Sequence, residues 1–464
     1  MYNRKIYRFY INNIDNDYHY GELVREFMPD DDFEVIAVDM SGMDGVKLGE
    51  NSYIVNSQAS ADRDEIKREL YRLLGDIKGH CTDWGTLTGV RPLKLALGMY
   101  EKSGNSAEYM KEHMKKDYLV SDNKISLLTE IADYQIAHLE GNPSDRAGLY
   151  IGIPFCPTRC EYCAFASNVA GDDEIAAYLD NLIREIDYMG SLVHEHGTKI
   201  ESIYIGGGTP TTLSAPQLRR LIAAVKRNFC RDGKDIEFTV EAGRPDTITE
   251  DKIGVLVDEG ISRISINPQT MKDETLQRIG RLHSADDIRK AYELTAGHFL
   301  VTNADLIAGL PGEDENDFRA SLDEIINLGA NNITVHTLSV KRGSRLREHD
   351  PEYYRRNTET VSAMLDYAHG RLTGLRYYPY YIYRQKHQMG SLENVGYCLE
   401  GMHSVYNIRI MEEKQTIIAL GAGAIGKVYY PAEDRLERIA NVSNYQIYSE
   451  RFDEMLERKK QYYQ

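Results

Sequence analysis

Three cysteines on one short stretch have the spacing that most directly indicates chemistry in this sequence. Cys156, Cys160 and Cys163 follow a C-x3-C-x2-C pattern within YIGIPFCPTRCEYCAFAS, and they are half of the six cysteines in the chain. Three thiolates on one loop can bind three irons of a four-iron, four-sulfur cluster, which leaves the fourth iron free for a ligand that is not protein. We therefore expect a [4Fe-4S] cluster with one open iron at this loop.

A structural zinc site and a disulfide framework are the alternatives for these cysteines. Zinc sites use four ligands, commonly as two pairs, and no fourth Cys or His lies nearby. Disulfide frameworks are typical of secreted, cysteine-dense chains, whereas this chain of 464 residues has only six cysteines. The spacing favours the open cluster. We expect the remaining cysteines to be buried free thiols; these are Cys81, Cys230 and Cys398.

A second motif, GGGTP at residues 206–210, directly follows an apolar run. Glycines let the backbone approach a ligand closely and direct N–H groups at a carboxylate or carbonyl groups at an ammonium. Taken alone, the motif indicates only a tight turn. Next to the cysteines it would suit the amino and carboxylate groups of S-adenosylmethionine, a ligand that could occupy the open iron.

The elements that must position these motifs alternate regularly from Gly148 onward. Helix-like segments lie around residues 174–196, 214–229, 249–259, 284–297 and 313–328. They separate six short apolar runs: Leu149–Ile153, Ser202–Ile205, Ile236–Val240, Ser262–Ile266, Val301–Ile307 and Asn332–Leu338. This alternation predicts an α/β fold with parallel strands and right-handed crossovers, arranged as a partial (β/α)6 barrel of the TIM type. Active sites of such folds lie at the carboxyl ends of the strands, and the cysteines follow the first run.

The regions on either side of this repeat have different patterns. Residues 1–145 combine strand-like runs at Lys5–Ile11, Phe33–Val38 and Ser52–Val55 with helical spacing over residues 62–77 and 124–139. We expect an N-terminal α+β domain over residues 1–145, a core domain over 146–340 and a C-terminal region over 341–464. In the last region we expect helices over residues 352–370 and 442–464.

Charge and targeting signals limit the partners of the chain. With 72 acidic and 55 basic residues the net charge is -17, so the chain as a whole repels phosphate backbones and anionic membranes. We therefore expect no nucleic-acid partner and no membrane association. The N-terminus does not have the pattern of a signal peptide, and together with unpaired cysteines this predicts a cytoplasmic location.

The cysteine spacing and GGGTP, placed on a repeat of strands and helices, resemble the radical S-adenosylmethionine superfamily. Within it, residues 149 to about 430 resemble the oxygen-independent coproporphyrinogen III oxidases through YIGIPFC, YIGGGTPT, RISINPQT, DLIAGLPGE and ALGAGAIGK. The longer strings GTLTGVRPLKL, EAGRPDTIT and YYIYRQKHQMGSLENVGY resemble the HemZ branch. The resemblance implies an oxidoreductase of porphyrin and haem biosynthesis that uses a [4Fe-4S] cluster and S-adenosylmethionine. It also implies a tetrapyrrole substrate and an electron donor such as flavodoxin or ferredoxin.

The resemblance also implies roles for single residues, although it names no certain catalytic residue. Around a first S-adenosylmethionine it places Tyr150, Gly207, Glu241 and Ile425. Around a second molecule, if two bind, it places Tyr162, Gly208, Thr209, Gln269, Arg281 and Asp305. From the residues alone, Glu241 could be a helix cap or an ion-paired carboxylate, Arg281 a surface helix charge and Asp305 a strand-end cap.

Two departures from the family pattern concern the reaction. The decarboxylating oxidases usually have a further cysteine where this chain has Phe165, and a histidine where it has Gly152. We expect oxidative decarboxylation of coproporphyrinogen III to protoporphyrinogen IX. The alternatives are a haem-binding chaperone of the same family, whose members also lack that cysteine, and a radical enzyme acting on another porphyrin or haem.

Basic residues near strand ends could bind the carboxylates of a tetrapyrrole. Basic residues at such places are more often solvated, so this patch is a hypothesis. The residues concerned are Lys341, Arg342, Arg345, Arg347, Arg384 and Lys386.

Overall fold

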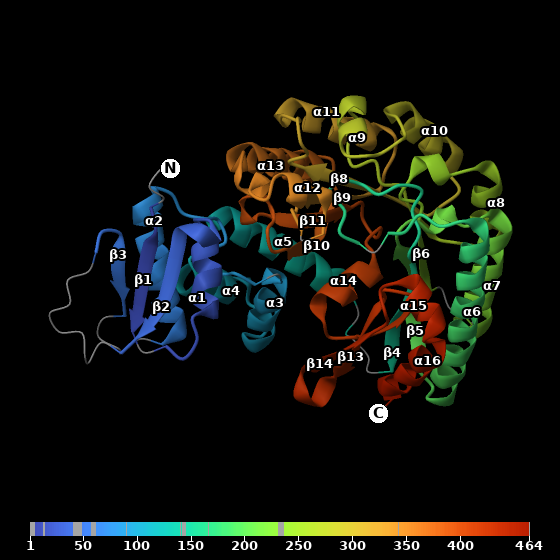
Figure 1. The fold of residues 1–464 in the computed structure, drawn as a ribbon, viewed down its shortest axis with the longest axis horizontal. Coiled ribbons are helices and arrows are strands. Elements are labelled where there is room, and N and C mark those ends of the chain that lie inside the picture. Colours follow the sequence, from blue (N-terminus) through green and yellow to red (C-terminus); the bar gives the residue numbers. More distant parts are fainter. Residues whose placement is uncertain are drawn as a thin grey trace. The chain divides into compact units, whose positions relative to one another are not determined.

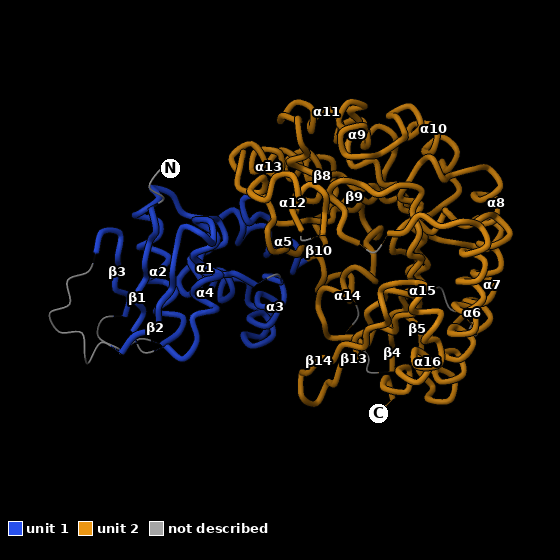
Figure 2. The backbone as a smooth tube through the Cα atoms, viewed as in Figure 1, with its two compact units in different colours: residues 1–133, 390–392 blue, residues 134–389, 393–464 orange. Residues whose placement is uncertain are grey.

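The computed structural model of the chain describes residues 5–12, 14–39, 49–56, 62–89, 91–139, 141, 145–165, 167–230, 236–341 and 343–463. The chain divides into two compact units, coloured separately in Figure 2: residues 1–133 with 390–392, and residues 134–389 with 393–464. The domain limits expected at residues 145 and 340 stay a prediction. No helix within the described ranges is long and apolar enough to cross a membrane.

The first unit contains a three-stranded parallel sheet in the order β2-β1-β3. Its strands are β1 (Tyr7–Asn12), β2 (Phe33–Val38) and β3 (Ser52–Val55). The helices of this part of the chain are α1 (Tyr18–Arg25), α2 (Arg63–Lys78), α3 (Pro92–Lys102), α4 (Ala107–Tyr118) and α5 (Asp122–His138), of which α5 continues into the second unit. The α2 helix begins where the sequence predicts because the Asp62 carboxylate accepts hydrogen bonds from two backbone N–H groups of the first turn.

An eleven-stranded sheet forms the centre of the second unit, in the order β10-β11-β9-β8-β7-β6-β5-β4-β12-β13-β14. Six adjacent parallel strands correspond to the six predicted apolar runs: β4 (Arg146–Ile153), β5 (Lys199–Gly207), β6 (Glu237–Glu241), β7 (Arg263–Ser265), β8 (Val301–Ala308) and β9 (Asn332–Thr337). Over the described strands, β10 and β14 do not pair with each other, so the sheet stays open. The predicted α/β fold with a partial barrel is confirmed.

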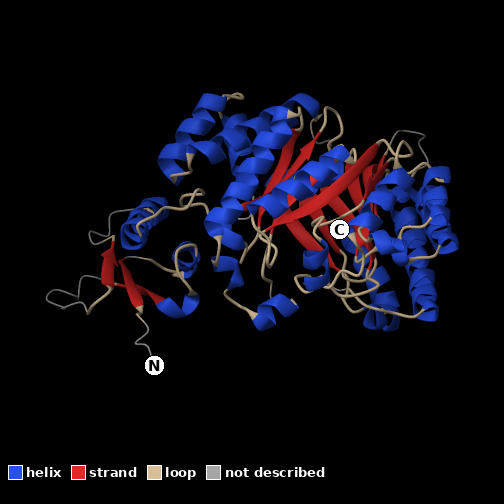
Figure 3. Cartoon of the chain, turned by 90° about the horizontal axis from the view of Figure 1, so that it is seen from above, coloured by secondary structure: helices blue, strands red, loops and turns tan. Residues whose placement is uncertain are grey.

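Helices connect the parallel strands and cover the outer face of this sheet (Figures 1 and 3). They are α6 (Asp172–Glu195), α7 (Ala215–Phe229), α8 (Glu250–Asp258), α9 (Asp273–Arg278), α10 (Ala285–Thr295) and α11 (Glu315–Asn327). In α7, the Ser214 and Gln217 side chains form a capping box, and Leu218, Leu221 and Val225 bury the inner face. The helical periodicity of the sequence therefore reports burial against the sheet.

The C-terminal region extends the sheet at both sides. Next to β4 it adds β12 (Thr416–Leu420), which is parallel, and then β13 (Ile425–Tyr430) and β14 (Arg435–Ala440), which are antiparallel. Next to β9 it adds the antiparallel strands β11 (Glu393–Cys398) and β10 (Tyr378–Arg384). In sequence, α12 (Arg345–His349) and α13 (Thr358–Gly374) lie between β9 and β10, and α14 (Val405–Glu412) lies between β11 and β12.

The tail differs from the single helix predicted over residues 442–464. It forms α15 (Tyr445–Glu450) and α16 (Phe452–Lys459), followed by a 3-10 turn. Arg451, with φ -104° and ψ 30°, interrupts the helical conformation between them. The interruption lets each helix bury its own face, including Tyr448 in α15 and Lys459 in α16. The helix predicted over 352–370 also begins later, at Thr358.

The remaining thiols follow the expectation only in part. Cys398 is buried and Cys230 is partly buried, but Cys81 is exposed, so the prediction of burial is wrong for Cys81. It lies just beyond Gly79, the residue in left-handed conformation that ends α2.

Candidate active site

The cysteine loop follows β4 at the carboxyl edge of the sheet, as predicted. Ile153 at the end of β4 pairs with Gly207 at the end of β5, so the loop and GGGTP leave the same edge. Backbone hydrogen bonds fix the loop: the N–H of Cys156 donates to the Asn168 carbonyl (3.0 Å) and the N–H of Cys163 donates to the Cys160 carbonyl (3.2 Å). The parallel topology thus brings both motifs together.

The triple glycine packs directly against the cysteine loop. The N–H of Gly208 donates to the Ile153 carbonyl (2.8 Å), and the N–H of Thr209 donates to the Phe155 carbonyl (2.7 Å). A Cβ atom on Gly208 would lie 2.4 Å from the Phe155 carbonyl oxygen and 3.0 Å from the Cys156 sulfur, so only glycine permits this approach. The Thr209 hydroxyl is hydrogen-bonded to the Cys156 sulfur (3.4 Å).

Gly207 has a related constraint. Its φ of +114° lies in the region that favours glycine, and a Cβ atom there would lie 3.0 Å from the Ile153 carbonyl oxygen and 3.4 Å from the Tyr150 hydroxyl. Gly207 and Tyr150, both expected near the first S-adenosylmethionine, therefore lie side by side.

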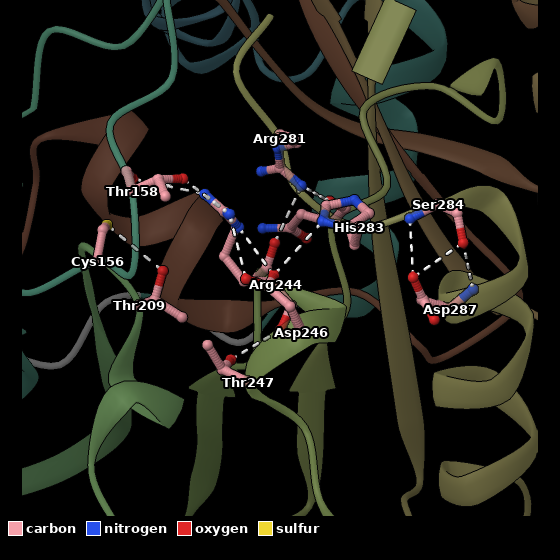
Figure 4. A network of polar contacts seen from close by, with 12 residues as sticks. Cys156, Thr158, Thr209, Arg244, Asp246, Thr247, Arg281, His283, Ser284 and Asp287 are labelled. Carbon is pink, nitrogen blue, oxygen red and sulfur yellow. Dashed lines mark hydrogen bonds and ion pairs between the residues drawn. The ribbon is translucent and has the colours of Figure 1, made fainter. Parts of the chain in front are cut away.

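A buried arginine that the sequence analysis did not single out connects the loop to the rest of the site. Figure 4 shows Arg244 between Thr158 and Asp246. Its Nη2 donates to the Thr158 hydroxyl (3.0 Å), its Nη1 to the Cys160 sulfur (3.8 Å) and its Nε to the Asp246 carboxylate (3.1 Å). The segment EAGRPDTIT contains this arginine, but only the fold shows that the guanidinium reaches a sulfur.

Asp246 and His283 complete this network. The His283 Nδ1 lies 3.5 Å from the Asp246 carboxylate, and the imidazole is buried. Burial opposes the charge of Asp246, but contacts with His283 and Arg244 outweigh it and lower the pKa of the carboxyl. The network therefore keeps a carboxylate next to the cation that contacts Cys160.

Burial disfavours the thiolate form of two of the three cysteines, Cys156 and Cys163. Burial raises the pKa of Cys156 to about 11, although the Thr209 hydrogen bond acts in the opposite direction. Burial also raises the pKa of Cys163. Iron binding must therefore displace protons from these sulfurs, and the charges of Arg244 and Arg281 favour the thiolates that result.

Tyr162, Gln269 and Arg281 also lie together at this edge. Arg281 is buried rather than a surface helix charge: Nη1 donates to the Gly243 carbonyl (3.2 Å), and the guanidinium interacts with the Tyr162 hydroxyl. Gln269 has φ +68° and donates its N–H to the Asp305 carbonyl (2.9 Å). Of the residues expected around a second S-adenosylmethionine, Tyr162 therefore contacts Arg281 and Gln269 contacts Asp305.

Glu241 ends β6 and faces the inside of the partial barrel. The Tyr204 hydroxyl donates to its carboxylate (2.6 Å), and no basic side chain among the described residues forms an ion pair with Glu241. Burial and the charge of Asp305 raise the pKa of Glu241 to about 7, against the Tyr204 hydrogen bond. The Tyr204 ring stacks on Tyr406 (4.7 Å between centroids) and on Tyr150 (6.3 Å). The stacked rings of Tyr150, Tyr204 and Tyr406 therefore lie next to the Glu241 carboxyl.

Asp305 lies within β8 and is not a strand-end cap. Its carboxylate accepts a hydrogen bond from the Asn303 amide (2.9 Å) and lies 3.6 Å from the His336 Nε2. The His336 Nδ1 is 3.1 Å from the Tyr383 hydroxyl. Burial works against the charge of Asp305, but the contacts with His336 and Asn303 lower the pKa of its carboxyl. Asp305 thus stays anionic inside the partial barrel.

Ile425 begins β13 and is 53% exposed. The preceding glycine loop is supported by Glu185, which accepts a hydrogen bond from the N–H of Gly421 (2.7 Å) and forms a fully buried ion pair with Lys459 (3.0 Å). The exposed side chain of Ile425 can contact a ligand.

The two departures from the family pattern differ in their surroundings. A Cβ atom on Gly152 would lie 3.4 Å from the Ala422 carbonyl oxygen, an ordinary contact. Phe165 is 67% exposed, and the Lys341 ammonium lies 5.4 Å from its ring centroid.

The six basic residues expected to bind carboxylates do not act as one patch. Arg345 pairs with Glu161 of the cysteine loop (3.1 Å), and Arg347 donates to the Pro351 carbonyl (2.9 Å). Arg384 and Lys386 also have interaction partners, and Arg342 lies outside the described residues.

The cysteine loop fits an iron-sulfur cluster rather than one metal ion. In the part of the chain that the structure describes, no three His, Cys, Asp or Glu side chains converge on a single ion. A four-iron cluster needs no such convergence, because each cysteine binds a different iron. The Thr209 hydroxyl at Cys156 and the guanidinium at Cys160 also suit an anionic cluster.

Comparisons with known proteins agree with this site. Residues 150–325 match the Radical SAM superfamily. The chain is 44% identical over 385 residues to the oxygen-independent coproporphyrinogen-III oxidase-like protein HemZ of Bacillus subtilis, over 82% of this chain and 76% of that protein. It is 28% identical to the haem chaperone HemW of Escherichia coli, over 61% and 70%. The structure of coproporphyrinogen III oxidase (HemN) from Escherichia coli matches with a TM-score of 0.53 and 22% identity, over 70% of this chain and 73% of that one.

The fold and the site thus define a member of the radical SAM superfamily. Within it, the chain belongs to the family of HemZ and related coproporphyrinogen III oxidase-like proteins. The cofactors predicted from the sequence, a [4Fe-4S] cluster and S-adenosylmethionine, are those of this superfamily.

Proposed function

We propose that the chain is a radical S-adenosylmethionine oxidoreductase that decarboxylates two propionates of coproporphyrinogen III and so forms protoporphyrinogen IX. The observation that carries the proposal is the convergence of three thiols, the triple glycine and the half-buried Glu241 carboxyl at one edge of the sheet. The 44% identity to HemZ supports the tetrapyrrole substrate class.

In this proposal Cys156, Cys160 and Cys163 bind the cluster. Gly207 offers backbone groups to the amino-acid part of S-adenosylmethionine, and Glu241 accepts hydrogen bonds from its ribose. The contacts with Tyr150 and Ile425 complete this site, and a second molecule is assigned to Tyr162, Gly208, Thr209, Gln269, Arg281 and Asp305.

The bound cofactors supply a 5′-deoxyadenosyl radical, which is the source of the oxidising power. Each propionate would lose a hydrogen atom from its β-carbon to this radical, one electron to an external one-electron acceptor, and carbon dioxide, and a vinyl group would remain. The protein supplies binding and orientation, and no acid and base pair is required. A flavodoxin or ferredoxin is proposed as the electron donor, and the cytoplasm as the location.

Anaerobic reconstitution with S-adenosylmethionine, a reductant and coproporphyrinogen III tests this reaction. We expect a product lighter by two carbon dioxide units and four hydrogen atoms. Cleavage of S-adenosylmethionine without this product would refute the decarboxylation.

A haem chaperone is the second candidate, because Phe165 replaces the further cysteine of the decarboxylating enzymes and a haem chaperone is among the relatives. Stoichiometric haem binding, transfer of the haem to an apoprotein and no porphyrinogen product would favour this function.

A further inference from the structure

Large apolar side chains are exposed at the edge of the sheet that carries the cysteine loop. Within the described ranges, Leu282 (75%), Val169 (69%) and Phe165 (67%) are the most exposed large apolar side chains. Phe165 and Val169 lie between β4 and α6, and Leu282 lies between β7 and α10, so all three follow carboxyl ends of parallel strands. Apolar side chains exposed at one edge of a sheet indicate a binding surface.

Hydrogen bonds hold the segments of this surface together. The N–H of Glu161 donates to the Ile279 carbonyl (3.0 Å), close to Leu282 in sequence. The N–H of Leu346 donates to the Glu161 carbonyl (2.9 Å) and thereby attaches the segment after β9 to the cysteine loop. The surface is therefore formed before a ligand arrives, which lowers the entropic cost of binding.

Lys341 lies on this segment and has no carboxylate partner among the described residues, whereas the neighbouring Arg345 is paired with Glu161 (3.1 Å). The Lys341 ammonium lies 5.4 Å from the centroid of the Phe165 ring. Its side chain is half-buried. An ammonium has three donors, and a ring face satisfies them poorly. Lys341 is thus suited to an anionic ligand that also covers Phe165.

We propose that Phe165 and Lys341 form a substrate rim, on which one pyrrole face of a carboxylate-bearing tetrapyrrole contacts the Phe165 ring and one propionate pairs with the Lys341 ammonium. This inference rests on the proposed function and names the residues that select its substrate. Charge complementarity supports it, because the chain has a net charge of -17 and Lys341 offers a local cation to a polyanion.

Binding of coproporphyrinogen III to the full-length, cluster-loaded chain, under anaerobic conditions and without S-adenosylmethionine, tests the rim. We expect Lys341→Gln and Phe165→Ala each to weaken binding by about tenfold, since a charge-assisted hydrogen bond and an aromatic contact are each worth roughly that much. Lys341→Arg and Phe165→Tyr, which keep the charge and the ring, should stay within about twofold of the original chain.

Two matched variants control for surface changes elsewhere. Lys290→Gln removes an exposed lysine that pairs with Asp286 on α10, and Leu300→Ala removes an exposed leucine (64%) just before β8. Neither substitution should change the affinity for coproporphyrinogen III. Iron content and S-adenosylmethionine affinity, measured on every variant, should also stay unchanged, which shows that the cluster loop is intact.

The outcomes separate this inference from the proposed function. If the original chain does not bind coproporphyrinogen III, the proposed function fails and the rim fails with it. If the original chain binds but Lys341→Gln and Phe165→Ala bind equally well, the rim alone is wrong. Equal weakening by Lys341→Arg and Lys341→Gln with unchanged iron content would also overturn it, because the charge would then have no role.

Discussion

Replacing Glu241 by glutamine removes a carboxyl whose negative charge lowers the stability of the ligand-free protein. Its pKa rises from 4.5 to about 7 because of burial and the charge of Asp305. Since the folded state has the higher pKa, the protonated group favours folding fully below about pH 4.5, and this contribution is lost as the pH rises through about 7. At about 1.4 kcal/mol for each pKa unit, the loss is about 3 kcal/mol.

Denaturant unfolding of the second unit, in cluster-free protein between pH 5 and pH 8, measures this effect. We expect Glu241→Gln to gain stability relative to the original chain with rising pH, by up to about 3 kcal/mol at pH 8. Glu324→Gln, on the outer helix α11 and paired with Arg289 (2.6 Å), is the matched control. A stability difference that stays constant from pH 5 to pH 8 would refute the buried-carboxyl reasoning. Because Glu241 is proposed to accept hydrogen bonds from the ribose, Glu241→Gln should also weaken S-adenosylmethionine binding. A residue kept for binding often lowers the stability of the protein.

Two further substitutions test the supports of the site. Lys459→Met removes the ion-pair partner of the buried Glu185 carboxylate and should lower the free energy of unfolding by roughly 3–5 kcal/mol. Lys460→Met, at the surface, should lower it by under about 1 kcal/mol. Equal losses in the two variants would contradict the burial of the Glu185–Lys459 pair. Gly208→Ala places a Cβ atom 2.4 Å from a carbonyl oxygen of the cysteine loop and should lower iron content after reconstitution, whereas Gly254→Ala, with open space around it, should not. Full iron content in Gly208→Ala would show that this close packing is not needed.

The parallel core could be predicted from the sequence because its signals are local. Each of β4 to β9 is a short apolar run, and helix starts such as Ser214 carry their own caps. The outer strands could not be predicted, because their pairing depends on distant segments: Thr416 of β12 pairs with Ala147 of β4. The break at Arg451 was also missed, since the apolar spacing continues through it.

The site could be predicted only where residue type and spacing carry the chemistry. Cys156, Cys160, Cys163 and the triple glycine meet this condition. Arg244 does not, because an arginine before a proline gives no sign that its guanidinium will be buried against a sulfur. His336 is likewise an ordinary strand residue until the fold places its imidazole between Asp305 and Tyr383.

Cluster loading with S-adenosylmethionine cleavage is the measurement that tests the central claim most directly. After anaerobic reconstitution we expect about four irons per chain and formation of 5′-deoxyadenosine on reduction. Both should be lost when Cys156, Cys160 and Cys163 are replaced by alanine, and retained when Cys81, Cys230 and Cys398 are replaced instead. A cluster that persists in the first variant, or a loaded original chain that leaves S-adenosylmethionine intact, would contradict the assignment of this loop.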